Sequence, residues 1–216
     1  MVKTFNIDAK GVVTKAHTPG FYTTGDNNWF YADSHGRNVT GAQVINGQHL
    51  YFDANGRQVK GGFVMNTDGS RSFYHWNTGD KLVSTFFTTG HDRWYYADDK
   101  GNVVTGAQVI NGQKLFFATD GKQVKGDFAT NANGSRSYYH GATGNKLVST
   151  FFTTGDNNWY YADAKGELVV GEQTINGQNL YFDQTGKQVK GATATNPDGS
   201  ISYYDVHTGE RLLIVG

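Results

Sequence analysis

The hydrophobic positions of this chain come in short clusters, each with two or three aromatic side chains. Examples are "WFYAD" from residue 29, "HLYFD" from residue 49 and "SFYHW" from residue 72. Each cluster is followed by a turn ending in Gly and by a short stretch that mixes polar and apolar residues. Aromatic and β-branched residues between frequent turn residues favour short strands. Each cluster with its turn therefore predicts a β-hairpin.

The hairpin pattern repeats with a period of 65 residues. Three kinds of unit, here called A, B and C, follow one another, and each unit B ends in Gln-Val-Lys-Gly. A partial unit at 1–20 precedes three copies of A, B and C, at 21–85, 86–150 and 151–216. The chain is thus a row of about ten units, and no shift in composition marks a boundary. We expect a single repeat domain over 1–216.

A single hairpin of about 20 residues cannot bury its own apolar face. Stacking each hairpin on the next supplies the missing partner, as in solenoid proteins. The sequence therefore predicts an all-β fold, an extended β-solenoid of stacked β-hairpins.

The pattern also predicts which side chains point into the stack. Side chains alternate across a strand, and opposite residues of a hairpin share a face. Folding unit B about the turn 53–56 places Leu50 opposite Val59, and these two residues form an apolar, inner face together with Phe52. Tyr51 and Gln58 then lie opposite each other on the outer face.

An aromatic pair of unit A is predicted to lie on the same kind of face as polar residues of the next unit B. Trp29 and Tyr31 form the aromatic pair, and Gln58 and Lys60 are the polar residues. A sugar can place its C–H face on an aromatic ring and its hydroxyls against an amide and an ammonium. The alternative is a purely structural role, in which Tyr31 packs on the next hairpin and Gln58 and Lys60 are ordinary solvent-exposed residues. Recurrence does not decide, because tandem duplication repeats packing and binding residues alike.

Composition and charge remove several classes of function. The formal net charge is +0, and no run of apolar residues is long enough to cross a bilayer, so we expect neither nucleic acid nor membrane insertion. The chain has no Cys, and its His residues form no metal motif, so we expect no metal and no cofactor. No catalytic constellation stands out. The recurring turn aspartates are expected to cap turns: Asp33, Asp53, Asp98, Asp163 and Asp183.

The units resemble the cell-wall and glucan-binding repeats of bacterial glucansucrases and glucan-binding proteins. The resemblance is carried by "WFYAD…GRNVTG", "QVINGQHLYFDANGRQVKG" and their copies, and it covers essentially the whole chain. It implies a non-catalytic, secreted or cell-wall-associated bacterial module, expected to be a monomer and part of a larger glucosyltransferase. It also implies multivalent binding of dextran-like α-glucan chains or isomalto-oligosaccharides.

In that family each sugar pocket uses a stacking Tyr and a Gln-x-Lys motif from the next repeat. Mapped onto this sequence, the resemblance implies three sets of sugar-binding residues: Tyr31, Thr40, Gln58 and Lys60; Tyr96, Thr105, Gln123 and Lys125; Tyr161, Gln188 and Lys190. The third set departs from the pattern, because Val170 replaces the Thr and Glu172 replaces an Ala.

Two other readings stay open. Choline-binding repeats are close relatives of this pattern, but they place a Trp directly after Thr-Gly, where this chain has Ala42 and Ala107. Two walls of an aromatic cage hold a quaternary ammonium poorly. The second alternative to glucan binding is a surface adhesin scaffold that has no sugar site.

Overall fold

The computed structural model describes residues 5–7, 11, 13–25, 28–154 and 158–212. Within them the chain forms only strands, bridges and turns, and no helix. The predicted all-β architecture of repeated hairpins is confirmed. The chain falls into two compact units, residues 1–104 and 105–216, which are described separately. The expectation of a single domain stays a prediction.

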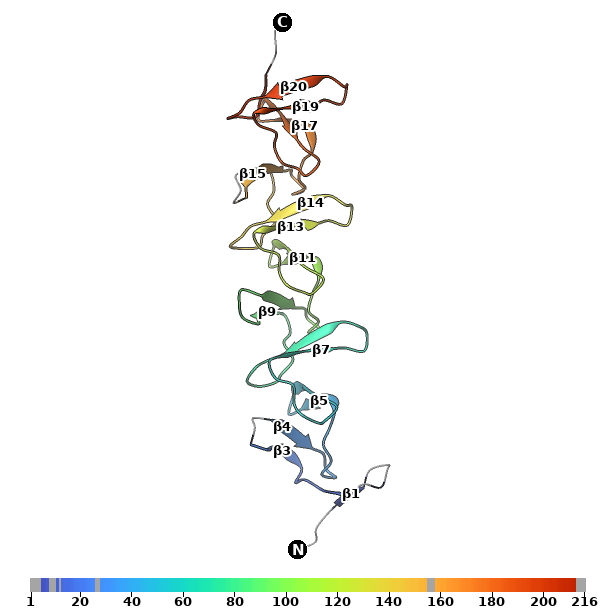
Figure 1. Cartoon of the computed structure of the whole chain (residues 1–216). Coiled ribbons are helices and arrows are strands. Elements are labelled where there is room, and N and C mark those ends of the chain that lie inside the picture. Colours follow the sequence, from blue (N-terminus) through green and yellow to red (C-terminus); the bar gives the residue numbers. More distant parts are fainter. Residues whose placement is uncertain (1–4, 8–10, 12, 26–27, 155–157, 213–216) are drawn as a thin grey trace. The chain divides into compact units, whose positions relative to one another are not determined.

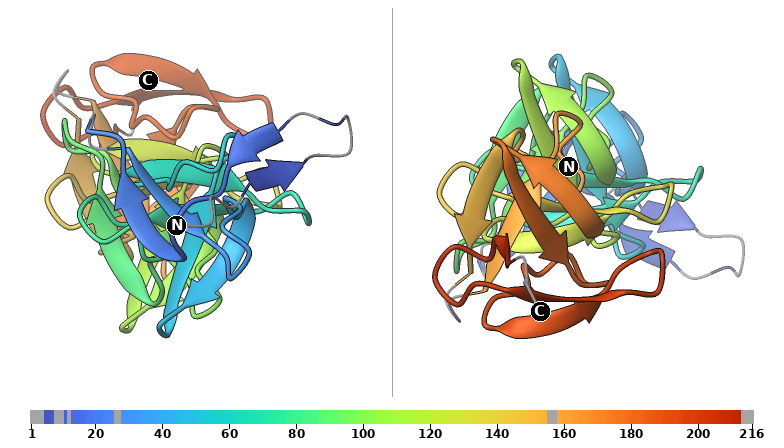
Figure 2. Two further views of the ribbon diagram at one scale, coloured as in Figure 1. Left: turned by 90° about the horizontal axis from the view of Figure 1, so that it is seen from below. Right: turned by 90° about the horizontal axis from the view of Figure 1, so that it is seen from above.

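In the first unit five antiparallel hairpins follow one another along the chain (Figure 1). Their strands are β1 (Phe5–Ile7), β2 (Val13–Lys15), β3 (Gly20–Thr23), β4 (Trp29–Ala32), β5 (Gly41–Ile45), β6 (Gln48–Phe52), β7 (Gly62–Met65), β8 (Arg71–Tyr74), β9 (Thr85–Thr88) and β10 (Trp94–Ala97). Figure 2 shows that successive hairpins of this unit point in different directions around the stack.

The second unit continues the same pattern. Its strands are β11 (Gly106–Ile110), β12 (Gln113–Phe117), β13 (Asp127–Thr130), β14 (Arg136–Tyr139), β15 (Thr150–Thr153), β16 (Trp159–Ala162), β17 (Gly171–Ile175), β18 (Gln178–Phe182), β19 (Ala192–Thr195), β20 (Ile201–Tyr204) and β21 (Arg211–Leu212). All pair as two-stranded hairpins, except that β21 adds a third strand to β19 and β20.

Backbone hydrogen bonds tie each hairpin to the next. In the first unit the N–H of Gln58 donates to the carbonyl of Trp29 (2.7 Å), and that of Lys81 donates to His49 (2.8 Å). In the second unit the N–H of Gln188 donates in the same way to Trp159 (2.7 Å). The residue after one turn thus pairs with the second strand of the preceding hairpin. This repeated link is the physical basis of the solenoid within each unit.

The core consists of small apolar clusters between successive hairpins. Ile45, Leu50 and Phe52 form one of them, and Tyr31 and Val39 from the preceding hairpin pack against it. The equivalent cluster of the second unit is built by Ile175, Leu180 and Phe182, with Phe151, Tyr161 and Val169 packed against it. Phe52 and Phe182 are completely buried. The prediction that Leu50 and Phe52 face inward is confirmed.

The hairpins close around turns other than the predicted ones. The strands of unit B pair across Asn46–Gly47, whose φ angles of 52° and 80° place both residues in the left-handed region. This is the Asn-Gly turn that matches the twist of a two-residue hairpin. The turn 53–56 instead leads into a single bridge, between Phe52 and Gln58.

That bridge corrects the predicted facing of Gln58. The sequence pattern predicted Gln58 opposite Tyr51, but the structure pairs Gln58 with Phe52. The N–H of the next residue, Val59, donates to the carbonyl of Tyr51 at 2.8 Å. Gly56, with φ 78°, adds one residue to the turn as in a G1 bulge. The register therefore slips by one position, and Gln58 turns to the buried side.

The turn aspartates behave as predicted. The Asp53 carboxylate accepts the backbone N–H groups of Asn55 and Arg57, both at 2.9 Å. Asp33, Asp98, Asp163 and Asp183 accept the corresponding pairs of N–H groups in their own turns. The hydrogen bond from the backbone of Arg37 lowers the pKa of Asp33. These carboxylates stabilise turns.

Candidate functional site

The Gln of each Gln-Val-Lys-Gly motif is held inside the stack. Gln58, Gln123 and Gln188 are 8%, 6% and 5% exposed. The amide of Gln58 donates to the carbonyl of Thr78 at 3.0 Å, and Gln188 donates to Thr208 at 3.0 Å. Gln123 makes the same contact with Thr143 at 3.5 Å. The amide nitrogen therefore positions the turn of the following hairpin.

A glycine makes room for this contact in each copy. A Cβ on Gly79 would lie 2.2 Å from the amide nitrogen of Gln58 and 3.2 Å from Cγ of Lys60. Gly144 and Gly209 face Gln123 and Gln188 in the same way, at 2.3 Å. The Gln amide and the Lys stem thus lie flat against the turn that follows.

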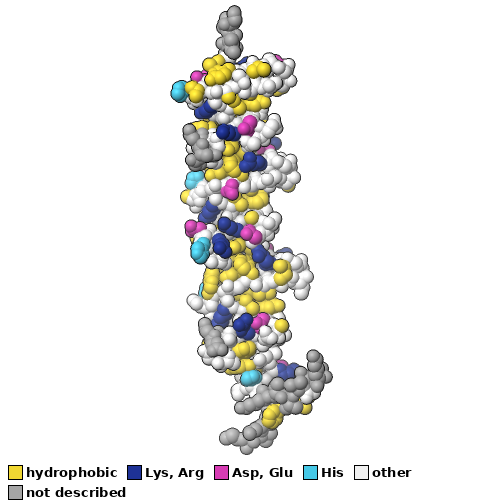
Figure 3. All heavy atoms as spheres, viewed as in Figure 1, with side chains coloured by type: hydrophobic (Ala, Val, Ile, Leu, Met, Phe, Trp, Pro, Cys, Tyr) yellow, Lys and Arg dark blue, Asp and Glu magenta, His cyan; other side chains and the backbone are white. Residues whose placement is uncertain are grey.

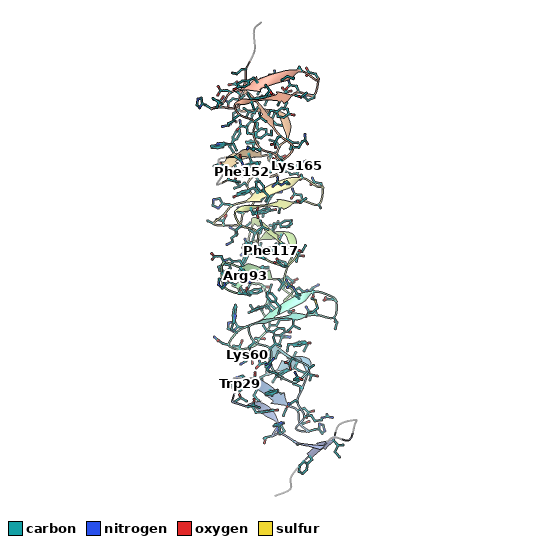
Figure 4. The ribbon with its side chains drawn as sticks, in the orientation of Figure 1. Trp29, Lys60, Arg93, Phe117, Phe152 and Lys165 are labelled. Atoms are coloured by element: carbon teal, nitrogen blue, oxygen red, sulfur yellow. The ribbon has the colours of Figure 1, made fainter. Side chains whose placement is uncertain are left out.

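The Lys of the motif lies over a Trp ring. Lys60 Nζ is 5.1 Å from the ring centroid of Trp29, and Figure 4 shows the two residues next to each other. Lys190 repeats this arrangement over Trp159, also at 5.1 Å. A cation at this distance from a ring centroid is attracted by the ring quadrupole. Burial lowers the pKa of Lys60.

In the second unit these groups line a pocket of about 330 Å³. Its lining residues are Asn158, Trp159, Asp183, Lys187, Gln188, Val189, Lys190 and Ala192. The ammonium of Lys190 also donates to the carbonyl of His207 at 3.0 Å, which fixes its place at the pocket wall. The pocket combines one aromatic ring with amide, ammonium and carboxylate groups. Such a wall fits a small neutral polyhydroxylated ligand.

The predicted stacking tyrosines lie beside this arrangement. Tyr31 is half-buried, packs on the core cluster of the next hairpin, and meets Phe21 nearly edge-on at 4.9 Å. Tyr161 packs in the same way, with Phe151 at 4.7 Å. Each Tyr is two residues after the Trp and on the same strand face. The structure thus shows that Tyr31 packs against the next hairpin, as the alternative without a sugar site expects. Contact of these tyrosine rings with a sugar stays a prediction.

The threonine position is exposed in the first copy. The carbonyl of Thr40 accepts the side-chain amide of Gln43 at 2.8 Å. Val170 takes this position in the third copy, is 45% exposed, and accepts the amide of Gln173 at the same distance. The backbone is therefore alike in the two copies, and at this position the third copy lacks the hydroxyl.

The second predicted set is divided between the two units. Tyr96 lies in the first unit, and Thr105, Gln123 and Lys125 lie in the second. As a set these four residues stay a prediction.

Sequence reasoning placed Trp29 in the aromatic pair on the face of Gln58 and Lys60, but it did not include Trp29 or Trp159 among the sugar-binding residues. A signal was present, because each stands two residues before the chosen Tyr and shares its strand face.

Other chemistry has little support in the described part of the chain. No group of three or more His, Asp or Glu side chains that would hold a metal is found there. None of its elements is a helix long and apolar enough to cross a bilayer. Basic and acidic side chains are interspersed on the face shown in Figure 3. That face, in the residues the structure describes, therefore offers no patch of one charge for a polyanion.

Comparison with protein families identifies the repeats. The choline-binding repeat family matches residues 39–86, 104–151 and 169–213, and the putative cell wall binding repeat matches 84–103 and 149–168. Among curated proteins, Glucosyltransferase-I of Streptococcus mutans is 47% identical over 190 residues, covering 88% of this chain and 13% of the relative. Glucosyltransferase-S of the same organism is 42% identical over 187 residues, covering 87% and 13%. The chain thus spans about an eighth of the length of these relatives.

Solved structures agree with this assignment at the level of the fold. Choline binding protein F of Streptococcus pneumoniae aligns with a TM-score of 0.63 and 20% identity, over 94% of this chain and 66% of that one. The choline-binding domain of CbpL from the same organism aligns with a TM-score of 0.58 and 17% identity, over 92% and 100%. Repeats of binding modules match along most of the chain, as expected for a binding region and not for an enzyme. The chain belongs to the choline-binding repeat family of cell wall binding repeats.

Proposed function

We propose that this chain is a carbohydrate-binding module that holds α-glucan chains, of the dextran type, in shallow pockets between successive hairpins. The observation that carries the proposal is the Trp ring that meets the Lys ammonium beside the Gln-x-Lys segment, seen alike in both units. The ring supplies a platform for the apolar face of a hexose, and the ammonium donates to its hydroxyls. The two curated relatives are glucosyltransferases, which supports glucan as the ligand.

In this proposal Trp29 and Lys60 contact the sugar, and Gln58 sets their positions while its carboxamide borders the pocket. Tyr31 and Thr40 extend the same face. The third pocket uses Trp159, Gln188 and Lys190 with Tyr161. The module would act outside the cell, as an anchoring part of a glucan-synthesising enzyme.

Choline is the second candidate, since the matching family and the aligned structures carry that name. A quaternary ammonium needs the faces of several aromatic rings. Here the Lys60 ammonium already occupies a place 5.1 Å from the Trp29 ring centroid. Two cations at one ring repel each other, and Ala42 stands where choline-binding repeats have a Trp. The geometry therefore favours a neutral sugar.

Retention on immobilised dextran and on a choline resin tests the proposal. We expect the intact chain to be retained by dextran and not by choline, and the double variant W29A/W159A to lose most of the dextran retention. The matched control is V44A/V109A, which removes two exposed apolar side chains, 66% and 72% exposed, that lie outside the pockets. Unchanged dextran retention of W29A/W159A would show that the pockets are not the site. Retention of the chain on the choline resin alone would favour the second candidate. If neither material retained the chain, a scaffold without a sugar or choline site would be the remaining interpretation.

A further inference from the structure

One aromatic residue near the first pocket has no counterpart in the other copies. Trp76 follows β8 and is 44% exposed. Its ring contacts Phe73 at 5.0 Å and covers Gly61, because a Cβ on Gly61 would lie 2.7 Å from Cδ1 of Trp76. Gly61 is the last residue of the first Gln-Val-Lys-Gly segment, so Trp76 lies directly against that segment.

The segment 58–61 runs between two Trp residues. At one end the N–H of Gln58 donates to the carbonyl of Trp29 (2.7 Å), and at the other the N–H of Gly61 donates to Tyr74 (2.9 Å), two residues before Trp76. Lys60 lies between them, with Nζ over the Trp29 ring. Its stem lies against Gly79, in the same turn as Trp76. Three residue steps cover at most roughly 10 Å of chain, so an oligosaccharide of a few hexoses is long enough to reach from the Trp29 end of the segment to the Trp76 end.

Packing alone does not require a Trp at this position. In the third copy Val206 covers Gly191, with Cγ2 3.1 Å from the built Cβ, and in the second copy Gly141 approaches Gly126 at 3.4 Å. A small side chain, or none, therefore satisfies the contact with the glycine. The surplus surface of the Trp76 indole stays in solvent, where an aromatic ring is available for stacking.

We propose that Trp76 is a second sugar platform of the first pocket and a determinant of its preference for longer oligosaccharides. With Trp29 it gives the first pocket two aromatic platforms, whereas the third pocket has Trp159 and only Val206 at the equivalent place. The first pocket would thus bind two or more consecutive glucose units, and the third would hold a single unit on its ring. This inference rests on the proposed glucan binding.

The test uses the full chain labelled with 5-fluorotryptophan and followed by fluorine NMR. The four Trp residues, Trp29, Trp76, Trp94 and Trp159, give four reporters, which single Trp→Phe variants assign. We expect the Trp76 and Trp29 signals to shift with one common midpoint during titration with isomaltotriose. Once the signals are assigned, the titration itself is carried out on the unsubstituted chain.

The variant W76V gives position 76 the residue found in the third copy. It should weaken isomaltotriose binding at the Trp29 reporter by about three- to tenfold, the effect of one aromatic contact, with a smaller effect on isomaltose. The Trp159 reporter should keep its midpoint and serves as an internal control. The reverse variant V206W should tighten binding at Trp159.

Two outcomes separate this inference from the proposed function. A shift of Trp29 and Trp159 with no shift of Trp76, or an unchanged Trp29 midpoint in W76V, would overturn the inference and leave glucan binding intact. No shift of any reporter at saturating sugar would overturn the proposed function, and the inference with it.

Discussion

At the scale of the residue, Gln and Lys of one short motif have different tasks. Gln58 is buried, and its amide hydrogen-bonds to the carbonyl of Thr78. Lys60 is less buried and directs its ammonium over the Trp29 ring. One residue therefore chiefly maintains the stack, and the other is available to a ligand.

Substitutions at these two positions should separate stability from binding. Q58A removes the donor to Thr78 and leaves a void against Gly79, so we expect a loss of about 1–3 kcal/mol in the free energy of unfolding, measured by urea denaturation. K60M keeps the apolar stem and should leave the unfolding midpoint nearly unchanged while it weakens isomaltotriose binding. If K60M melted the protein and Q58A only weakened binding, the two assignments would be reversed.

At the scale of the element, glycines set the register of each hairpin. Gly56 and Gly47 both have φ near 80°, a region that costs an L-residue roughly 1 kcal/mol. Their surroundings differ. A Cβ on Gly56 would lie 2.9 Å from Cβ of Asn38 in the preceding hairpin, whereas nothing lies within 4 Å of one on Gly47.

This pair provides a matched test of hairpin stacking. G56A and G47A share the backbone strain, and only G56A adds a clash with the neighbouring hairpin. We expect G56A to be the less stable variant by about 1–3 kcal/mol, measured as the difference between their unfolding free energies. Equal losses would indicate that the hairpins do not pack closely at this turn.

At the scale of the whole molecule, the repeat multiplies a weak site. A shallow pocket with one ring and a few polar groups should bind a short oligosaccharide only at about millimolar Kd, near 4 kcal/mol. Each of the two units carries one complete Trp–Lys arrangement. A long glucan can therefore engage one unit and then the other as a tethered ligand.

We predict that high-molecular-weight dextran binds more tightly than isomaltotriose, by roughly 10²–10⁴ where the polymer spans two or more sites. Titration calorimetry with both ligands measures the difference. The single variant W159A should reduce the affinity for dextran by a larger factor than the affinity for isomaltotriose, because it removes one of the contact points that the polymer uses together. Equal affinities per mole of site for the two ligands would mean that the repeats act singly.

The sequence by itself determined the architecture of this protein. A period of 65 residues, aromatic clusters and Gly-ended turns predict stacked β-hairpins, because alternation and turn chemistry are local properties. The inward facing of Leu50 and Phe52 follows from the same alternation and is confirmed. The turn-capping role of Asp53 needs only the residues of its own turn.

Only the tertiary structure decided which side chains meet between hairpins. The left-handed Gly56 adds one residue to its turn, and this slip exchanges the two faces for Gln58. Side chains alternate between the two faces of a strand, so a shift of one residue moves each side chain to the other face. The sequence pattern therefore predicted Gln58 opposite Tyr51, whereas the structure pairs it with Phe52. The partner ring of Lys60 comes from the preceding hairpin, and the stacking contacts between hairpins select Trp29 for that place.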